Sequence, residues 1–456
     1  MAVIGEKMAY PMDLSGMKAT LRTLGCKLNY AETSTIEDRL RREGVEITNG
    51  GGADICIVNT CSVTETADHK CRQTIHKLVK ENEGCLMVVM GCYAQLQPRR
   101  LAETAGVDIV VGSENKGHII EYIRRGLALK RAAAGAALHH SESSALRDIK
   151  TFVPSCSRGD RTRFFLKVQD GCDYFCSYCT IPYARGLSRS PSVASIVEQA
   201  RRVAAQGGKE IVITGVNIGD FGRGSSENFL QLVEALDKVE GIERYRISSI
   251  EPNLLTKEII DFCAASRRFM PHFHIPLQSG SDAVLKLMRR RYDTAFFADK
   301  IGEVHSAMPD AFVGIDVIVG TRGETPGLFE ETCGFLEGLD FAQLHVFPYS
   351  ERPGTAALRI PYTVAPQERH ARVERLIALS ERKRKAFYRR FCGTERTVLW
   401  EHTVHGGNIH GFTDNYIRVE IPAAEALRPG DSSMGRVELG EMNADESALT
   451  CTRITR

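Results

Sequence analysis

The chain has 456 residues, 43% of them hydrophobic and 25% charged, which is ordinary for a globular protein of roughly two to four domains. Its fourteen cysteines come without a signal peptide or an apolar run long enough to cross a bilayer, so we expect a cytoplasmic protein without membrane attachment. In a reducing compartment its thiols are ligands or core residues. The net charge of +2 excludes a strongly basic protein, so any nucleic-acid surface has to be local.

Strand patterns alternate with helix patterns from Lys18 onward. The hydrophobic spacing predicts strands at residues 19–24, 54–59, 86–90 and 108–111, with helices at 30–43 and 64–82. Such alternation predicts a parallel sheet covered by helices, which we assign to a first domain at residues 18–130. Segment 131–144 is rich in small residues and lacks a strand pattern, so residues 131–157 are assigned to a linker.

A second alternation follows within residues 158–391. Apolar runs predict six strands, at residues 164–168, 211–214, 244–249, 273–275, 312–319 and 344–347. Helical stretches such as 193–206 and 229–239 separate them, and six β/α units predict a partial barrel rather than a closed barrel of eight. Residues 366–391 have a helical composition. Short β-rich runs at 398–400, 416–421 and 436–439 then predict a small all-β barrel at residues 392–456.

The most specific motif is Cys172-Asp-Tyr-Phe-Cys176-Ser-Tyr-Cys179, which follows the first strand of the second alternation. Three thiolates in one tight loop can hold a cubic [4Fe–4S] cluster and leave its fourth iron open to an amine or carboxylate of another molecule. A structural zinc site would require four ligands. The alternative is three unrelated loop cysteines. The spacing, with the aromatic Tyr178, resembles that of radical S-adenosylmethionine enzymes.

A second set of cysteines occupies one position in three successive β/α units. Cys26, Cys61 and Cys92 each come just after a predicted strand. Because the carboxyl ends of parallel strands meet at one edge of a sheet, these side chains could converge. Small buried thiols are the alternative. For the other eight cysteines a core or surface role is favoured, namely for Cys56, Cys71, Cys85, Cys156, Cys263, Cys333, Cys392 and Cys451.

Four motifs together resemble the methylthiotransferase family of radical S-adenosylmethionine enzymes. They are Thr23-Leu-Gly-Cys-Lys-Leu-Asn29, Asn59-Thr-Cys61, Gly91-Cys-Tyr-Ala-Gln95 and Cys172–Cys179. The resemblance implies a second [4Fe–4S] cluster on Cys26, Cys61 and Cys92, and a C-terminal TRAM barrel. Ser248-Ser-Ile-Glu251 and His345-Val-Phe-Pro-Tyr-Ser350 resemble the branch that modifies threonylcarbamoyladenosine. The expected fold class is therefore α/β: a parallel sheet domain, a partial (β/α)6 barrel and an all-β barrel.

Polar residues at the carboxyl ends of the barrel strands are candidates for binding S-adenosylmethionine, because barrel enzymes place their active sites there. Gln169, Asp170 and Ser350 occur at the same rim. Each also has an alternative role as a hydrogen-bonded strand end. The candidates are Tyr178, Thr214, Gly215, Asn217, Ser248, Ser249, Glu251, His274, Gln278, Asp316 and Tyr349.

Charge is unevenly distributed at the C-terminal end. Residues 393–456 carry ten acidic side chains against six arginines, a net charge of −4, which disfavours this barrel alone as an RNA grip. Residues 367–391 carry nine basic and three acidic side chains, a net charge of +6. A solvated helix face is the alternative. The candidate RNA contacts are Arg185, Arg189, Arg289, Arg290, Arg382, Lys383, Arg384 and Lys385.

The resemblance implies a monomeric tRNA methylthiotransferase with two [4Fe–4S] clusters and S-adenosylmethionine. It would convert N6-threonylcarbamoyladenosine at position 37, beside the anticodon, to its 2-methylthio derivative. Its partners would be the tRNA anticodon stem-loop and an electron donor such as a flavodoxin or ferredoxin. The alternatives are methylthiolation of isopentenyladenosine in tRNA or of a ribosomal-protein aspartate, and a non-catalytic iron–sulfur RNA-binding protein.

Overall fold

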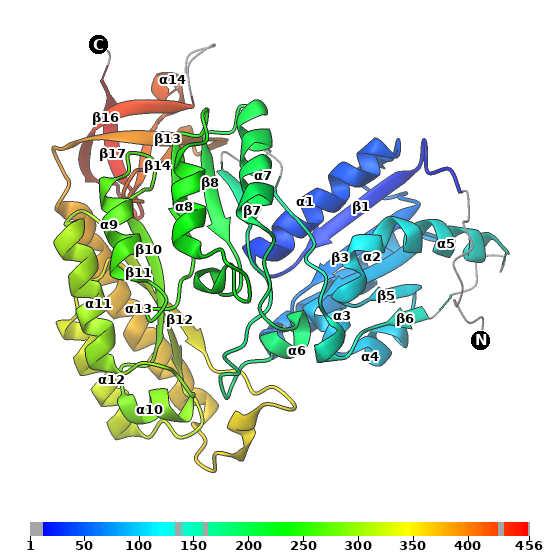
Figure 1. The fold of residues 1–456 in the computed structure, drawn as a ribbon, viewed down its shortest axis with the longest axis horizontal. Helices are drawn as coiled ribbons and strands as arrows, with labels where there is room; N and C mark the ends of the chain where they lie inside the picture. The colour runs from blue at the N-terminus through cyan, green and yellow to red at the C-terminus, as the bar shows by residue number, and fades with distance from the viewer. Residues whose placement is uncertain (1–11, 133–137, 139, 158–162, 427–432, 455–456) are drawn as a thin grey trace. The chain divides into compact units, whose positions relative to one another are not determined.

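The computed structural model describes residues 12–132, 138, 140–157, 163–426 and 433–454 (Figure 1). The chain forms two compact units. Unit 1 comprises Met1–Arg158, Phe165–Pro191 and Ser350–Thr355, and unit 2 comprises Gly159–Phe164, Ser192–Tyr349 and Ala356–Arg456. The cysteine motif at 172–179 therefore belongs to the same unit as the first alternation of strands and helices.

Unit 1 is built on a six-stranded sheet in the order β2-β1-β3-β4-β5-β6, with all neighbouring strands parallel. This confirms the predicted parallel sheet. The strands are β1 (Lys18–Thr23), β2 (Glu46–Ile47), β3 (Ile55–Thr60), β4 (Leu86–Gly91), β5 (Ile109–Val111) and β6 (His140–Glu142). The helices are α1 (Lys27–Arg42), α2 (Glu65–Glu81), α3 (Cys92–Leu96), α4 (Pro98–Ala102), α5 (Ile119–Ala132) and α6 (Ile181–Arg185).

Both faces of the central strands are buried, because every residue of β3 and β4 is buried whichever face it points to. Ile57 of β3 and Val88 of β4 pack with α1 and α5 in one core cluster. Val58 and Val89, one residue further on, pack with α2, α3 and α4 in the other cluster. The carboxyl edge of the sheet is thus held between two layers of helices.

One expectation for this region is wrong. Segment 131–144 is not free of strands, since β6 pairs in parallel with β5 through Ile109↔His140 and extends the sheet. Only three residues form this edge strand, too few for a period-two pattern to stand out. Residues 133–137 and 139 of the expected linker lie outside the described residues.

The second series of strands forms two three-stranded sheets, β7-β8-β9 and β10-β11-β12, in sequential order. A parallel bridge between Ser249 and His274 connects them, as expected for a partial barrel of six strands. The strands are β7 (Arg163–Lys167), β8 (Glu210–Thr214), β9 (Arg244–Ile247), β10 (His272–Gln278), β11 (Phe312–Val319) and β12 (Gln343–Pro348). The helices are α7 (Val193–Ala205), α8 (Phe229–Asp237), α9 (Lys257–Ala265), α10 (Asp282–Leu287), α11 (Thr294–Ala307) and α12 (Pro326–Gly338).

Unit 2 ends in a long helix and a closed five-stranded barrel, β13-β14-β15-β17-β16. The elements are α13 (Pro366–Arg389), β13 (Glu395–His405), β14 (Asn408–Thr413), β15 (Arg418–Pro422), α14 (Ala423–Ala426), β16 (Met434–Met442) and β17 (Leu449–Arg453). Phe312 of β11 and Phe387 of α13 share one apolar core with Trp400 of the barrel. Within the described residues, no helix is long and apolar enough to span a membrane.

Two buried arginines of β9 fasten the small barrel to the strands of unit 2. Arg246 donates to Glu210 Oε1 at 3.0 Å and to the carbonyl oxygens of Thr413 and Asp414 at 2.7 and 2.8 Å. Arg244 donates to the carbonyl oxygens of Phe412 and Thr397. Burial alone would raise the pKa of Glu210, but the guanidinium groups around it lower that pKa, so the carboxylate stays charged.

Replacing Arg246 tests this attachment. Arg246→Leu leaves a buried carboxylate short of a partner and removes the guanidinium donor from two carbonyl groups, so it should lower the free energy of unfolding by about 3–5 kcal/mol. Trp400 is the sole tryptophan of the chain and lies in the barrel core, so its fluorescence during denaturant unfolding reports the loss. The control is Arg202→Leu, which removes an exposed ion pair with Glu198. A loss below about 1 kcal/mol for Arg246→Leu would contradict the assignment.

Candidate functional site: two cysteine triads in one unit

Cys26, Cys61 and Cys92 lie at the carboxyl ends of three adjacent parallel strands. Cys26 is the N-cap of α1, Cys61 follows the last residue of β3, and Cys92 is the first residue of α3 after β4. Since β1, β3 and β4 are neighbours in the sheet, the three thiols reach the same edge. The three thiols are close enough to interact electrostatically: Cys61 with both Cys26 and Cys92, and Cys92 with Cys26.

Two glycines allow the chain to approach these cysteines closely. Gly25 has φ +105°, and a Cβ built on it would lie 2.7 Å from the Cβ of Cys61. Gly91 has φ +101°, and its Cβ would lie 2.4 Å from the carbonyl oxygen of Thr60. A side chain at either position would clash in a conformation that only glycine adopts readily. The glycines before Cys26 and Cys92 therefore allow the segments that carry the three cysteines to pack closely.

Asn29 holds two of the cysteine loops against each other. Its Nδ2 donates to the carbonyl oxygens of Leu24 and Thr60 at 2.8 and 3.0 Å. The hydroxyl of Thr60 in turn donates to the carbonyl oxygen of Met90 and accepts from the backbone N–H of Ala94. These bonds join the residues beside Cys26, Cys61 and Cys92 into one hydrogen-bonded set.

The second triad lies in a tight loop. The backbone N–H of Tyr174 donates to Cys172 Sγ at 3.5 Å, and that of Ile181 donates to Cys179 Sγ at 3.4 Å. Phe175 adopts φ +50°, and Gly171 lies where a Cβ would come within 2.0 Å of the carbonyl oxygen of Leu187. Amide donors directed at sulfur stabilise thiolates, the form that binds iron.

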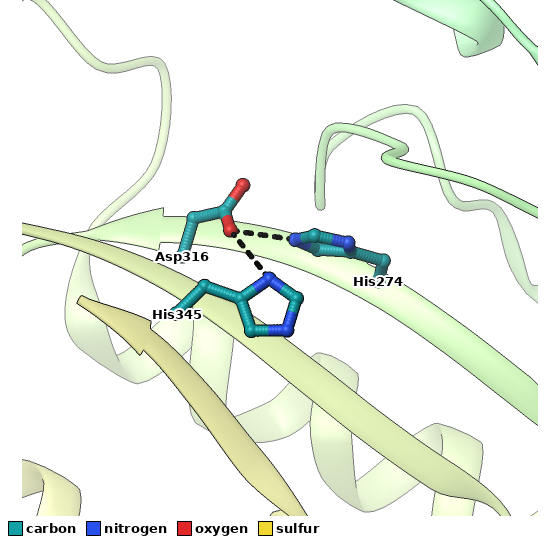
Figure 2. A group of neighbouring side chains, drawn as sticks. All are labelled: His274, Asp316 and His345. Atoms are coloured by element: carbon teal, nitrogen blue, oxygen red, sulfur yellow. Dashed lines mark hydrogen bonds and ion pairs between the residues drawn. The ribbon is translucent and has the colours of Figure 1, made fainter. Parts of the chain in front are cut away.

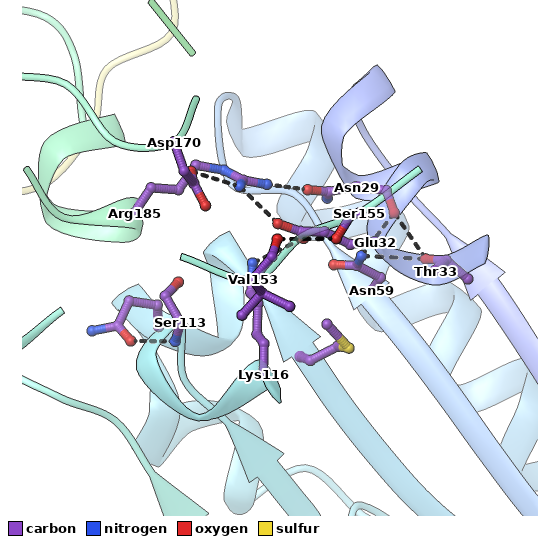
Figure 3. A network of polar contacts seen from close by, with 12 residues as sticks. Asn29, Glu32, Thr33, Asn59, Ser113, Lys116, Val153, Ser155, Asp170 and Arg185 are labelled. Atoms are coloured by element: carbon purple, nitrogen blue, oxygen red, sulfur yellow. Dashed lines mark hydrogen bonds and ion pairs between the residues drawn. The ribbon is translucent and has the colours of Figure 1, made fainter. Parts of the chain in front are cut away.

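A buried ion network joins the segments that carry the two triads (Figure 3). Glu32 of α1 accepts from Lys116, Lys167 and Arg185, each at 3.0 Å. Arg185, six residues after Cys179, also donates to Asn29 Oδ1 at 2.6 Å and to Asp170 Oδ1 at 3.1 Å. The side chains of Glu32, Lys116, Lys167 and Arg185 are all less than 5% exposed.

The network carries excess positive charge beside the first triad. Two carboxylates, Glu32 and Asp170, face four cations, which are Lys116, Lys167, Arg185 and Arg189. Burial raises the pKa of the Cys92 thiol, while Arg185 and Lys116 act in the opposite direction. Burial likewise raises the pKa of Cys61 to about 12. Three thiolates on a cluster would supply the missing negative charge, so the residues present fit an iron–sulfur group.

A cavity of about 240 Å³ adjoins the ligand segments of both triads. Its lining includes Leu96, at the end of the helix that begins with Cys92, and Thr180, which follows Cys179. Arg352 contributes a guanidinium that donates to Ser62 Oγ and Asp68 at 2.7 and 2.6 Å. The remaining lining residues are Gln97, Tyr183, Pro353 and Gly354. The volume is slightly below the roughly 300 Å³ at the lower end of small-molecule sites, so the cavity can hold a small group or part of a larger one.

The structure places most of the predicted S-adenosylmethionine contacts at the ends of unit 2 strands. Thr214 ends β8, Ser248 and Ser249 follow β9, and Gln278 ends β10 with φ +75°. Glu251 forms an ion pair with Arg290, and burial raises the pKa of this carboxyl. His274 and Asp316 contact each other in mid-strand. Gly215 and Asn217 follow β8, Tyr349 is buried after β12, and Tyr178 lies in the cysteine loop of unit 1.

Several predicted RNA contacts have other partners. Arg185 is about 1% exposed and is fully engaged in the network, so its prediction as an RNA contact is wrong. Arg290 is tied to Glu251 and Tyr292. In α13, Arg382 pairs with Glu337, and Lys383 donates to two carbonyl oxygens. Arg384 and Lys385 bind Glu446, and Arg189 donates to Asp170 and Thr151.

The exposed fraction of each side chain shows which of these cations could still contact RNA. Arg289 is exposed, and Arg382 keeps 60% of its side chain exposed despite its ion pair. Arg384 is buried. An RNA role for α13 therefore stays a prediction, and the same side chains fasten the helix to neighbouring segments of unit 2.

The sequence interpretation missed Glu32, Lys116, Lys167 and Arg352. The one available signal was Lys167, a lysine inside the apolar run Phe164-Phe-Leu-Lys-Val168. A buried lysine requires charged partners; one of them, Asp170, is three residues further on, but the other, Glu32, is 135 residues away in the chain. Of the eight other cysteines, Cys71 donates to the carbonyl oxygen of Cys61, and Cys56, Cys85, Cys263, Cys333 and Cys451 are buried. Cys156 and Cys392 are partly exposed.

Comparisons with known proteins agree with this geometry. Residues 18–112 match the family described as uncharacterized protein family UPF0004, and residues 166–336 match the radical SAM superfamily. These two segments contain both cysteine triads. The two matches together place this chain in the class of radical S-adenosylmethionine enzymes that carry an additional N-terminal domain.

Full-length relatives give a narrower classification. The chain is 39% identical to threonylcarbamoyladenosine tRNA methylthiotransferase MtaB of Bacillus subtilis, over 89% of this chain and 90% of the relative. It is 34% identical to the protein of that name from Aquifex aeolicus, over 89% and 96%. The tRNA-2-methylthio-N(6)-dimethylallyladenosine synthase of Geobacter sulfurreducens is 33% identical, over 89% and 92%. The chain belongs to the radical S-adenosylmethionine methylthiotransferase family.

Solved structures support the fold alone. The radical S-adenosylmethionine methyltransferase TsrM of Kitasatospora setae matches with a TM-score of 0.54 and 14% identity, over 73% of each chain.

Glu32→Gln tests the network. The change removes the carboxylate that three buried cations share and leaves Lys116 without one, while Lys167 and Arg185 keep only Asp170. We therefore expect a loss of about 3–5 kcal/mol in the free energy of unfolding of the iron-free chain. The control on the same helix is Glu37→Gln, whose carboxylate lies 3.8 Å from the exposed Arg41 and should matter by less than about 1 kcal/mol. Equal effects of the two substitutions, measured by chemical denaturation, would contradict the assigned role.

The network also predicts a dependence on pH. Burial opposes ionisation of Glu32 and Asp170, but the surrounding cations hold both pKa values well below their usual range. Their contribution to stability is therefore complete above the unfolded-state pKa of about 4, and it is lost as the pH falls below that value. Unfolding free energies between pH 7 and pH 3 should decline less steeply for Glu32→Gln than for the unchanged chain. Parallel declines would contradict the assignment.

Proposed function

We propose that this protein adds a methylthio group to C2 of N6-threonylcarbamoyladenosine at position 37 of tRNA, beside the anticodon. The observation that carries the proposal is the presence of two cysteine triads in one compact unit, joined by the buried network around Glu32. Relatives named for this reaction, from five bacterial species, are 32–39% identical over most of the chain.

The two cysteine triads would have different roles in the reaction. Cys172, Cys176 and Cys179 would hold the cluster that binds S-adenosylmethionine, with Tyr174 and Ile181 donating backbone N–H groups to the sulfurs. When bound, that cluster supplies the electron that cleaves S-adenosylmethionine. Cys26, Cys61 and Cys92 would hold the second cluster, from which the sulfur is delivered. Arg185 and Lys116 offset the negative charge that three thiolates bring.

Separate segments contribute polar groups to the cofactor and to the substrate. Thr214, Ser248, Ser249 and Gln278, at strand ends of unit 2, are suited to the ribose and aminoacyl groups of S-adenosylmethionine. The cavity beside both triads offers Gln97, Thr180 and Arg352 to a planar base. An adenine in the anticodon loop is single-stranded, so turning it into such a cavity costs little.

The proposed reaction requires a tRNA substrate and a source of electrons. The partners would be the tRNA anticodon stem-loop and a small electron carrier such as a flavodoxin or ferredoxin, and the enzyme would act as a monomer in the cytoplasm. The functional divisions would be residues 18–130 for the second cluster, 158–391 for the radical chemistry and 392–456 for a TRAM barrel, with 131–157 between the first two.

A second candidate substrate is isopentenyladenosine at the same tRNA position. The relatives named tRNA-2-methylthio-N(6)-dimethylallyladenosine synthase, at 30–33% identity, support it. Nucleoside mass spectrometry of tRNA from cells lacking this chain separates the two. Loss of 2-methylthio-N6-threonylcarbamoyladenosine supports the proposal, loss of the isopentenyl derivative supports the second candidate, and unchanged tRNA overturns both.

Two cysteine substitutions separate the roles of the triads. Cys61→Ser should abolish methylthiolation while leaving reductive cleavage of S-adenosylmethionine, because the cluster loop at 172–179 is unchanged. Cys176→Ser should abolish both activities. Iron content should fall by about half in each variant. Cys263→Ser, at a buried cysteine of unit 2, is the matched control and should keep both activities. Methylthiolated product from Cys61→Ser would overturn the role of the first triad.

A further inference from the structure

Three side chains of metal-binding types meet on one face of the sheet β10-β11-β12 in unit 2 (Figure 2). Asp316 pairs with His345 in the strand register, and His274 pairs with Gly314, two residues before Asp316. Because side chains alternate across a strand, this register places all three on the same face. One nitrogen of each ring and one oxygen of Asp316 all lie within 4.8 Å of one another. The strand register therefore brings two imidazoles and a carboxylate to one point.

The carboxylate of Asp316 differs from the buried carboxylates of unit 2 in its partners. Within the described residues, its ion pairs are only with His274 and His345. Buried carboxylates elsewhere in unit 2 pair with an arginine: Glu210 with Arg246, Glu251 with Arg290, and Glu324 with Arg372. Burial would raise the pKa of Asp316, but its contacts with the two rings lower that pKa well below the usual range, so the carboxylate is ionised. A neutral imidazole does not balance this charge, and a bound cation would.

The distances within the group are close to those around a metal ion. His345 Nδ1 lies 3.5 Å and His274 Nε2 lies 2.6 Å from the same Asp316 oxygen. Around an ion with bonds of ~2.1 Å, neighbouring ligand atoms lie roughly 3.0–3.4 Å apart. The shorter contact is a hydrogen bond, and a small rotation of the carboxylate about its soft terminal torsion opens it. His274 then binds through the Nε2 lone pair, in the tautomer that has its proton on Nδ1.

The group is open to further ligands. The side chains of His274 and Asp316 are 17% and 18% exposed, and that of His345 is 39% exposed. Two histidines and one carboxylate with open coordination positions bind divalent ions such as Fe²⁺ and Zn²⁺ in other proteins. Water or an oxygen of another molecule fills the remaining positions, whereas a closed structural site would have four protein ligands.

We propose that His274, Asp316 and His345 bind one divalent first-row transition-metal ion, distinct from the iron of the two clusters. The ligand atoms are His274 Nε2, one carboxylate oxygen of Asp316 and His345 Nδ1, so the ion connects β10, β11 and β12. His274 lies four residues before Gln278, the last residue of β10, and the ion is therefore separate from the strand ends suited to S-adenosylmethionine. The inference goes beyond the proposed function and does not depend on it.

The test uses the cluster-loaded enzyme without RNA or S-adenosylmethionine, so that iron occupies the cysteines of both triads. Mn²⁺ is the probe, because carboxylate and water ligands suit it and thiolates do not. Electron paramagnetic resonance measures the free ion as enzyme is added. We expect one saturable site per chain, and pulsed measurements should detect imidazole nitrogen coupled to the bound ion.

Substitutions of the ligands test where the ion binds. Asp316→Asn and His345→Gln should each weaken Mn²⁺ binding by at least about tenfold. His345 is the most exposed of the three, so His345→Gln tests the site even if Asp316→Asn does not fold. The control is His305→Gln. His305 Nε2 lies 3.8 Å from an Asp340 oxygen, and this pair belongs to no group of three ligands among the described residues, so full affinity should remain.

No saturable binding of Mn²⁺ by the unchanged enzyme would overturn the inference and leave the group as a set of hydrogen bonds. Equally tight binding in His345→Gln and Asp316→Asn would also overturn it, because the ion would then lie elsewhere. So would a bound ion that shows no coupling to nitrogen. Methylthiolation does not enter these measurements, so a failure of the proposed function is distinguished from a failure of the metal site.

Discussion

The structure of unit 1 depends on one buried carboxylate, Glu32, which three cations share. It lies on the helix that begins at Cys26, and it accepts from Arg185, on the segment that carries the second cysteine triad. Removing such charges from water costs several kcal/mol per ion, so the arrangement persists only if every member keeps its partners. The network therefore fixes the segment after Cys179 against the helix after Cys26.

The buried network around Glu32 connects the cysteine triad proposed to cleave S-adenosylmethionine with the triad proposed to deliver sulfur. The cations exceed the carboxylates in the network, and the excess lies beside Cys92, where thiolates on iron would balance it. The two proposed cluster sites thus share the charges of one buried network. Asn29 has a part in both halves, since it joins the loops of Cys26 and Cys61 through its Nδ2 and accepts from Arg185 through its Oδ1.

Most of the fold follows from local patterns, and most of the network does not. Alternating apolar runs predicted the parallel sheet, the six barrel strands and the C-terminal barrel, because period and length are local properties. The edge strand β6 is too short to show a period. The cysteines were found because the chemistry of iron restricts their spacing and their place after a strand. Glu32 and Lys116 are 84 residues apart, and nothing local marks them as partners. Burial of Arg185, likewise, could not be predicted from its position in a basic motif.

The most direct test of the network as a link between the triads is the coupling of S-adenosylmethionine cleavage to product. Arg185→Lys keeps the charge but loses the forked geometry that reaches Glu32, Asn29 and Asp170 together. The ratio of 5′-deoxyadenosine to methylthiolated tRNA should be measured for this variant and the unchanged enzyme, at equal iron content. We expect the ratio to rise several-fold, because cleavage continues while sulfur transfer slows. An unchanged ratio would show that the network does not link the two triads.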